Sequence, residues 1–248
     1  MKYVLLVRDI CFHFLIPDAP VKCLRKFFSG TVVFFCSFHE VARMWFISFV
    51  KSSIGKKTVM AASGLLLIAF LTVHAFGNAA IYMGGNYFQI YADTLHSFPV
   101  LVWVFGAGLV LIFAAHIVTA SVLYFESLEI RTSRYHVQTR VVENSFASRT
   151  MPYTGLVILV FLIVHVFGFV VAPAHDVPIS VTVRELLSNV VYGLFYIVSF
   201  VCLAIHLSHG FWSMLQTFGV SHPRFDTFLV RSSMAVAVFF LLFFSGIP

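Results

Sequence analysis

The chain has 248 residues, of which 60% are hydrophobic and only 10% charged, and its mean hydropathy is +0.96. A composition this apolar excludes an ordinary soluble domain and indicates a membrane protein. The net charge of +6 does not indicate a nucleic-acid partner, because most of the basic residues flank apolar runs.

Residues 1–43 lack the pattern of a spanning helix. An arginine and an aspartate interrupt the first apolar stretch of this segment, and a polar cluster interrupts the second. Neither stretch has the features of a clean span or of a cleavable signal peptide. An aromatic segment followed by lysines begins at Met44, and such a segment normally introduces a first span. We therefore expect an N-terminal extension over 1–43, with Met44 as the natural start, and a membrane domain over 44–248.

The membrane domain contains five apolar segments. A spanning helix needs about 20 predominantly apolar residues, and each segment is long enough to supply one. The spans are expected at about 58–78, 99–125, 152–172, 189–215 and 227–247. The sequence therefore predicts an all-α, five-helix integral membrane bundle.

The basic residues indicate how this bundle is oriented. Those on one side of the predicted topology are Lys51, Lys56, Lys57, Arg131, Arg134, Arg140, Arg149, Arg224 and Arg231. The loops on the other side contain only Arg184. By the positive-inside rule, the segment before the first span lies in the cytoplasm and the C-terminus lies outside.

The first and third spans contain the same block. Residues 60–77, MAASGLLLIAFLTVHAFG, recur 91 residues later as MPYTGLVILVFLIVHVFG. Each copy contains one histidine, His74 or His165. A second histidine follows each after 42 or 41 residues, at His116 and His206. The first and second spans and the third and fourth spans therefore form two equivalent hairpins, a parallel repeat.

The four repeat-related histidines lie at two depths. His74 is 17 residues beyond Lys57, about 25 Å along a helix at 1.5 Å per residue, and His165 is at nearly the same height. His116 and His206 lie about 15 Å above the inner ends of their helices. A histidine within a membrane is costly unless it has a partner. Two b-type haems are therefore predicted, the outer held by His74 and His165 and the inner by His116 and His206.

Other residues of the spans are weaker candidates. Ser63 and Thr154 are expected near the inner haem, and Ser199 near the outer one. They either make room for the flat macrocycle or serve ordinary small-residue helix packing. His209 lies three residues beyond His206 and competes with it as a ligand. The near-equal hairpin spacing favours His206, so His209 is expected to line the pocket or to bond a haem propionate.

Several motifs of the membrane domain match a known family. They are SSIGKK before the first span, VHAFGN at 73–78, YADTLHSFP at 91–99, HIVTASVLY at 116–124, SRTMPYTG at 148–155 and HLSHGFWSMLQTFG at 206–219. Through them, residues 44–248 resemble the cytochrome b subunit of type B succinate:menaquinone oxidoreductases (succinate dehydrogenases) and fumarate reductases.

This resemblance implies a membrane anchor with two haems b in the inner (cytoplasmic) membrane of a bacterium. A flavoprotein subunit carrying FAD and an iron–sulfur subunit would bind its cytoplasmic face. Electrons from succinate would pass through the inner and then the outer haem to menaquinone or another quinone. The chain itself has no catalytic residues for succinate oxidation, since it lacks a dinucleotide fingerprint and a cysteine cluster.

Quinone reduction also requires proton delivery to the ring oxygens. Tyr91, Asp93 and His96 are expected in a loop on the outer side, near the level of the outer haem. All three are candidates for a quinone site, and for Asp93 and His96 the alternative is a solvated loop residue.

Two other functions remain open. The first is the cytochrome b subunit of another respiratory complex, of the hydrogenase or formate dehydrogenase type. The second is a transporter whose histidines relay protons or bind a metal, since parallel repeats also occur in transporters. The lack of an intramembrane carboxylate beside the histidines argues against the transporter.

Overall fold

The structure is a computed structural model. It describes residues 2–6, 24–28, 31–129, 146–171, 177–220 and 222–247, with the backbone alone before Arg43 and at Met44. Three arginines predicted on the cytoplasmic side, Arg131, Arg134 and Arg140, lie outside these residues. The chain divides into two compact units, residues 1–56 and 57–248, and each is considered by itself.

The first unit contains a small antiparallel sheet followed by a helix. The strands β1 (Lys2–Leu6), β2 (Leu24–Phe28) and β3 (Thr31–Ser37) pair in the order β1-β3-β2. The central strand, TVVFFCS, is rich in the β-branched and aromatic residues that favour strands. Helix α2 (Phe38–Lys51) follows directly. The sequence patterns did not identify these strands within the expected N-terminal extension.

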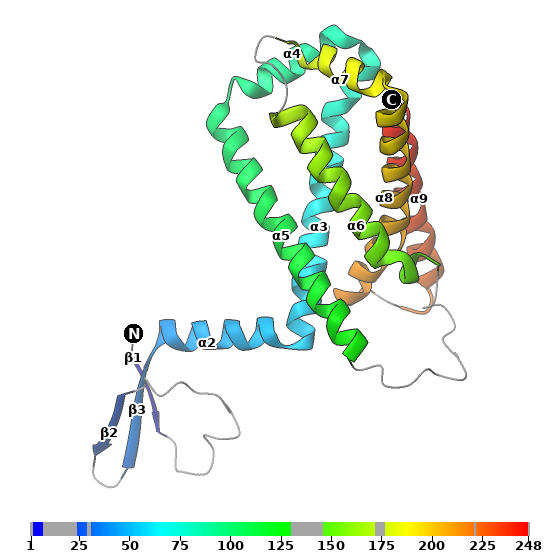
Figure 1. The fold of residues 1–248 in the computed structure, drawn as a ribbon. Helices are drawn as coiled ribbons and strands as arrows, with labels where there is room; N and C mark the ends of the chain where they lie inside the picture. Colours follow the sequence, from blue (N-terminus) through cyan, green and yellow to red (C-terminus); the bar gives the residue numbers. More distant parts are fainter. Residues whose placement is uncertain are drawn as a thin grey trace. The chain divides into compact units, whose positions relative to one another are not determined.

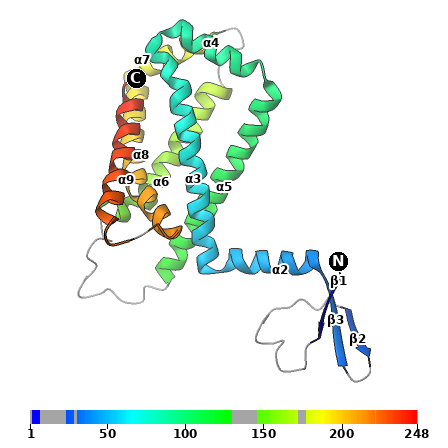
Figure 2. The ribbon, with the colours of Figure 1, turned by 180° about the vertical axis from the view of Figure 1, so that it is seen from behind.

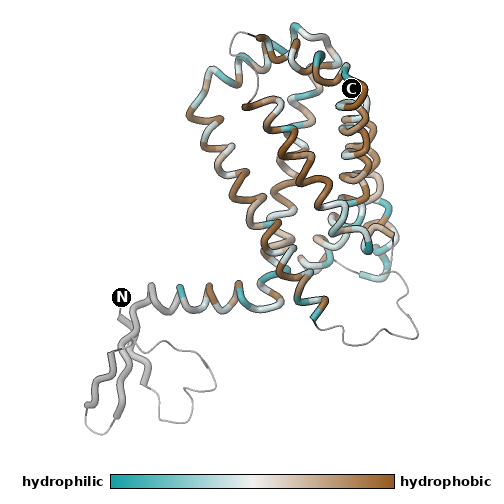
Figure 3. The backbone as a smooth tube through the Cα atoms, in the orientation of Figure 1, coloured by the Kyte–Doolittle hydropathy of each residue, from teal (hydrophilic) through white to brown (hydrophobic). Residues whose placement is uncertain are grey.

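Five helices of the described residues are long and apolar enough to cross a membrane, as predicted. They are α3 (Ser53–Asn78, continued by the 3-10 turn η1, Ala79–Met83), α5 (Pro99–Glu129), α6 (Phe146–Val166, continued by the π turn η2, Phe167–Val171), α8 (Val190–Thr217) and α9 (Asp226–Ser245). Figure 1 shows them as a bundle, and Figure 3 shows their apolar middles and more hydrophilic ends. The chain is therefore a multi-pass membrane protein.

Most of these helices extend beyond the predicted spans, because a helix ends at its caps and not where the apolar run ends. The Ser52 hydroxyl accepts from the Gly55 amide at 3.0 Å and caps α3 ahead of the lysines. The Asn189 side chain accepts from the first amides of α8 at 3.0 and 3.2 Å. Pro99 is the first residue of α5, where its missing N–H has no cost.

Two short helices lie together at one end of the bundle, opposite the start of α3 (Figure 1). They are α4 (Gly85–His96), between the first two spans, and α7 (Ile179–Ser188), between the third and fourth. The prediction of a loop at Tyr91, Asp93 and His96 is therefore wrong, because these residues belong to α4. The Gln89 side-chain oxygen accepts from the amide and hydroxyl of Ser180 at 3.2 and 3.3 Å and joins α4 to α7.

Helix α8 forms the centre of the packing, between α6 and α9. The buried cluster combines Tyr196, Phe200 and Leu207 of α8 with Ala237, Phe240 and Phe244 of α9 and with Ala75 of α3. The rings of Phe200 and Phe244 stack with their centroids 5.6 Å apart. Figure 2, from behind, shows α9 alongside α8. The fifth span thus packs mainly on the second hairpin, and among the described helices of this unit none packs in the same way on the first.

Candidate functional site

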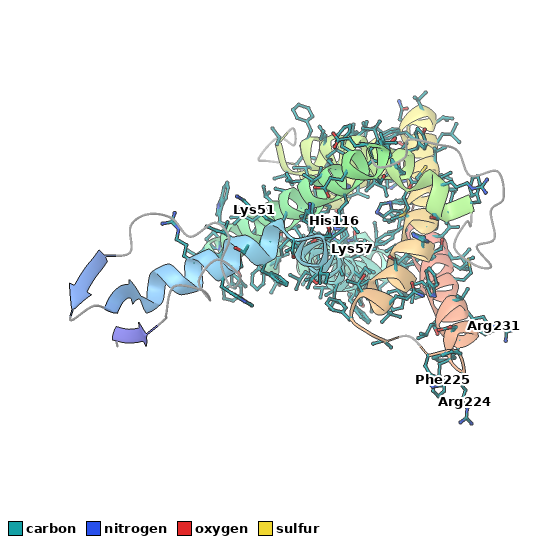
Figure 4. The ribbon with its side chains drawn as sticks, turned by 90° about the horizontal axis from the view of Figure 1, so that it is seen from below. Lys51, Lys57, His116, Arg224, Phe225 and Arg231 are labelled. Atoms are coloured by element: carbon teal, nitrogen blue, oxygen red, sulfur yellow. The ribbon has the colours of Figure 1, made fainter. Side chains whose placement is uncertain are left out.

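The inner histidines meet between α5 and α8. The ring centroids of His116 and His206 lie 6.4 Å apart, with 63° between the ring planes. The Ser63 hydroxyl on α3 lies 3.2 Å from Nδ1 of His116. The Thr154 hydroxyl on α6 lies at the same distance from Nδ1 of His206. In Figure 4, a view along the bundle, His116 lies within the ring of helices. Each hairpin therefore supplies one histidine and one hydroxyl partner to this layer.

These hydroxyl contacts determine which nitrogen of each ring is free. The Ser63 hydroxyl donates to the Val59 and Met60 carbonyls at 2.8 and 3.0 Å, so its oxygen is left to accept from His116 Nδ1–H. The Thr154 hydroxyl donates to its own helix in the same way, at 3.1 Å to each of two carbonyls, and accepts from His206. Both rings then keep an unprotonated Nε2, the form in which an imidazole binds a metal.

Two glycines lie directly against the inner rings. A Cβ atom at Gly64 would be 3.5 Å from His116 Cε1, and one at Gly155 would be 3.5 Å from His206 Cε1. The two positions are 91 residues apart and fall in the repeated block. The backbones of α3 and α6 therefore leave matched space beside the two imidazoles, the kind of space that a flat ligand between them requires.

The outer histidines meet between α3 and α6. The ring centroids of His74 and His165 lie 5.9 Å apart, with 81° between the planes. Each ring packs on a phenylalanine one turn earlier in its own helix, Phe70 or Phe161, with centroids 5.5 Å apart in both cases. Phe244 of α9 also contacts His74, at 6.1 Å. The outer layer is thus walled by aromatic rings.

A tyrosine distinguishes the two outer histidines. Nδ1 of His165 lies 3.2 Å from the Tyr196 hydroxyl, which lies 3.3 Å from the Tyr192 hydroxyl. His116 and His206 are equivalent and lie 90 residues apart, so the residue of the first hairpin equivalent to Tyr196 is Gly106. A Cβ at Gly106 would meet nothing within 4 Å. The hydroxyl chain is therefore present in one hairpin only.

The spacing of both pairs suits a shared metal atom. A bound imidazole nitrogen lies about 2 Å from its metal and about 1 Å from the centre of its own ring, so two rings on opposite sides of one metal have centroids roughly 6 Å apart. The measured values are 5.9 and 6.4 Å. In the described part of the chain, no three His, Cys, Asp or Glu side chains are placed to hold a metal ion. Two imidazoles per layer suit an iron whose other ligands come from a macrocycle.

The contacts also show the symmetry of the repeat. His74 meets His165, His116 meets His206, and α4 Gln89 meets α7 Ser180, which lies 91 residues later in the chain. Contacts between equivalent positions occur where a two-fold axis passes. The two hairpins are therefore related by a pseudo-two-fold axis that passes between both histidine pairs.

The weaker candidates in α8 are not part of these contacts. Ser199 is buried and donates to the Phe195 carbonyl at 2.7 Å, a bond within its own helix. The His209 ring lies beside Trp212, with centroids 5.9 Å apart, and it is the His206 ring that faces His116. Neither side chain lies between the paired imidazoles, and the expectation that each lies beside a haem stays a prediction.

The three quinone candidates differ in their surroundings. His96 Nδ1 lies 2.8 Å from the Ala92 carbonyl, and Asp93 accepts from Gln89 at 2.7 Å, so both are engaged within α4. The Tyr91 hydroxyl instead reaches α3, where it lies against Gly77, three residues beyond His74. Of the three, only Tyr91 approaches a histidine layer.

Several residues of the site were not predicted from the sequence. Gly64 and Gly155 were visible as matching letters in the repeated block, so the repeat carried a signal for them. Tyr196 and Tyr192 have no counterparts in the first hairpin, and no sequence pattern marks them. Their place beside His165 depends on how α6 packs against α8.

Replacing Thr154 by valine keeps the shape of the side chain but removes the acceptor for His206 Nδ1–H. Loss of such a supporting bond typically costs about 10- to 100-fold in metal affinity. For the haem predicted from the sequence at the inner pair, we expect transfer to a competing apoprotein to be at least about tenfold faster from Thr154→Val than from the unchanged protein. Thr72→Val is the matched control, since the Thr72 hydroxyl donates only to the Ile68 carbonyl. Equal transfer rates in the two variants would contradict the supporting role of Thr154.

Comparisons of the chain with protein-family models, with curated proteins and with solved structures find no match. The grounds for a function are therefore the sequence motifs and the arrangement of the residues described above.

Proposed function

We propose that this chain is a membrane cytochrome b with two haems, and that it is the anchor subunit of a succinate:quinone oxidoreductase. The observation that carries the proposal is the presence of two layers of paired imidazoles in one apolar bundle. Haem b, when bound, supplies reversible one-electron chemistry at its iron. The sequence resemblance supplies the choice of succinate and of a quinone as the electron donor and acceptor.

In this proposal the residues of the chain hold and insulate the two cofactors. His74 and His165 would ligate the iron of the outer haem, and His116 and His206 would ligate that of the inner haem. The Ser63 and Thr154 hydroxyls fix the inner rings with Nε2 free for the metal. The apolar helices exclude water from both layers, which helps to set the haem potentials.

The basic end of the bundle is the proposed docking face for the flavoprotein and the iron–sulfur subunit. Lys57 and Arg149 lie near the starts of α3 and α6, and Arg231 lies in the first turns of α9. Arg224, just before α9, has its guanidinium 6.0 Å from the Phe225 ring centre. In Figure 4 Arg224 and Arg231 point away from the bundle. By the positive-inside rule this end is cytoplasmic, and it is nearer to the inner histidines.

A redox-difference spectrum of the purified protein, with pyridine haemochrome quantitation, tests the core of this proposal. We expect two low-spin haems b per chain, one for each pair of imidazoles. Colourless protein from cells well supplied with porphyrin would contradict it.

The electron donor is tested on the complex isolated from its native membrane. Succinate is expected to reduce both haems, and a flavoprotein and an iron–sulfur protein are expected to co-purify. Reduction by hydrogen or formate, with no response to succinate, would instead assign the chain to one of the other respiratory complexes.

A further inference from the structure

An open groove of about 700 Å³ lies between α6, α7 and α8, at the end of the bundle where α4 and α7 meet. Its walls are largely apolar, with Val160 and Val164 from α6 and Phe195 from α8. The polar lining includes Glu185 of α7 and Tyr192 of α8. The volume is within the range of about 300–1,000 Å³ typical of small-molecule sites, and an apolar pocket with few polar groups is their usual composition.

This groove is connected to the outer histidine layer by hydrogen bonds. Tyr192 lines the groove, its hydroxyl lies 3.3 Å from that of Tyr196, and the Tyr196 hydroxyl lies 3.2 Å from His165 Nδ1. Gly168 makes the approach possible, since a Cβ there would come within 2.6 Å of the Tyr192 hydroxyl. Gly168 belongs to the π turn that follows His165, and such turns are frequent at functional sites.

We propose that this groove binds the ring of a lipid-soluble quinone, with the Tyr192 hydroxyl bonded to one ring oxygen. The proposal rests on the proposed function and assigns its quinone site to α6, α7 and α8. A lipid acyl chain would fit the valine walls, but it offers no acceptor to the tyrosine. A quinone offers an apolar ring and two acceptor oxygens, which match both parts of the lining.

The chemistry balances with the groups available. Reduction of a quinone to a quinol takes two electrons and two protons, one proton for each ring oxygen. Haems held by the two histidine pairs would supply the electrons one at a time, with succinate as the reductant of the proposed function. Tyr192 donates a hydrogen bond to one ring oxygen. Both protons come from the water outside, and the exposed carboxyl of Glu185 in the lining passes them into the groove. At the 90-residue offset the first hairpin has Val102 and Gly106 in place of Tyr192 and Tyr196, so it lacks an equivalent proton path.

Direct binding of a fluorescent quinone analogue, a hydroxyquinoline N-oxide, tests the groove on the purified protein with both haems. Tyr192→Phe removes one neutral hydrogen bond and is expected to weaken binding about fivefold. Val160→Trp fills the groove from the wall that faces the lipid and is expected to abolish measurable binding. Tyr87→Phe, at an exposed tyrosine of α4 outside the groove, is the control and should bind as the unchanged protein does. Haem content should be the same in all four proteins.

The possible failures are distinguishable. Unchanged binding in Tyr192→Phe and Val160→Trp, with weaker binding in Tyr91→Phe, would overturn the groove and leave the proposed function standing. Loss of binding in Val160→Trp alone would place the analogue in the groove but overturn the role of Tyr192. Protein that holds two haems but does not bind the analogue would also overturn the groove. Protein without haem would overturn the proposed function and the groove with it.

Discussion

Replacing His206 by alanine is expected to reduce the haem content from two haems b per chain to one. His206 faces His116 at 6.4 Å, and without it the inner iron would keep one protein ligand and lose the second. Among the described residues, no third imidazole ring faces this pair, so none is placed to replace His206 as a ligand. The measurement is the pyridine haemochrome ratio together with the redox-difference spectrum, in which the signals of one haem should disappear.

His209→Ala is the control for this change, because it removes a histidine from the same helix, one turn further on. The His209 ring packs beside Trp212 and not beside His116, so this variant should keep both haems. Loss of a haem from His209→Ala, or two haems in His206→Ala, would show that the ligands are assigned wrongly. Alanine at any of the other three predicted ligands, His74, His116 or His165, should likewise remove one haem.

The five spans could be predicted because the bilayer imposes one requirement on each of them. About 20 apolar residues are needed whatever the tertiary packing, so composition alone identifies such helices. The histidine pairs could also be predicted, because the 91-residue repeat gives the equivalent positions and the rise per residue of a helix gives the depth of each histidine. Ser63 and Thr154 followed from the same reasoning and lie at the inner pair, as their heights predict.

The remaining features depend on packing that composition does not encode. Helices α4 and α7 are short and mixed in polarity, so Tyr91, Asp93 and His96 looked like loop residues. The place of Tyr196 beside His165 is set by contacts between residues 31 positions apart on two different helices. The packing of α9 on α8 depends on stacked phenylalanines in a chain that has 30 of them. No periodicity distinguishes a phenylalanine that packs on α8 from one that faces lipid.

A second large loss of haem is expected from changing Gly64, a residue with no side chain that could bind iron. A Cβ at Gly64 would lie 3.5 Å from His116 Cε1, which is an ordinary van der Waals contact. Gly64→Ala should therefore keep both haems. Gly64→Leu adds three further carbon atoms, and the rotamers allowed in a helix keep them over the neighbouring turn, beside the imidazole. We expect Gly64→Leu to lose the inner haem, so that the ratio falls from two to about one, while the outer haem keeps its spectrum.

The repeat provides a stringent check on this expectation. Gly155 stands in the same relation to His206 as Gly64 does to His116, with the same 3.5 Å approach. Because both glycines border one layer, Gly155→Leu should remove the same haem as Gly64→Leu. Gly106→Leu is the matched control, since a Cβ at Gly106 in α5 would meet nothing within 4 Å, and it should retain two haems. Equal haem loss in all three variants would show that leucine in a membrane helix is itself the cause. Haem loss from Gly64→Leu and Gly155→Leu alone requires that the space beside both imidazoles belongs to one shared cofactor.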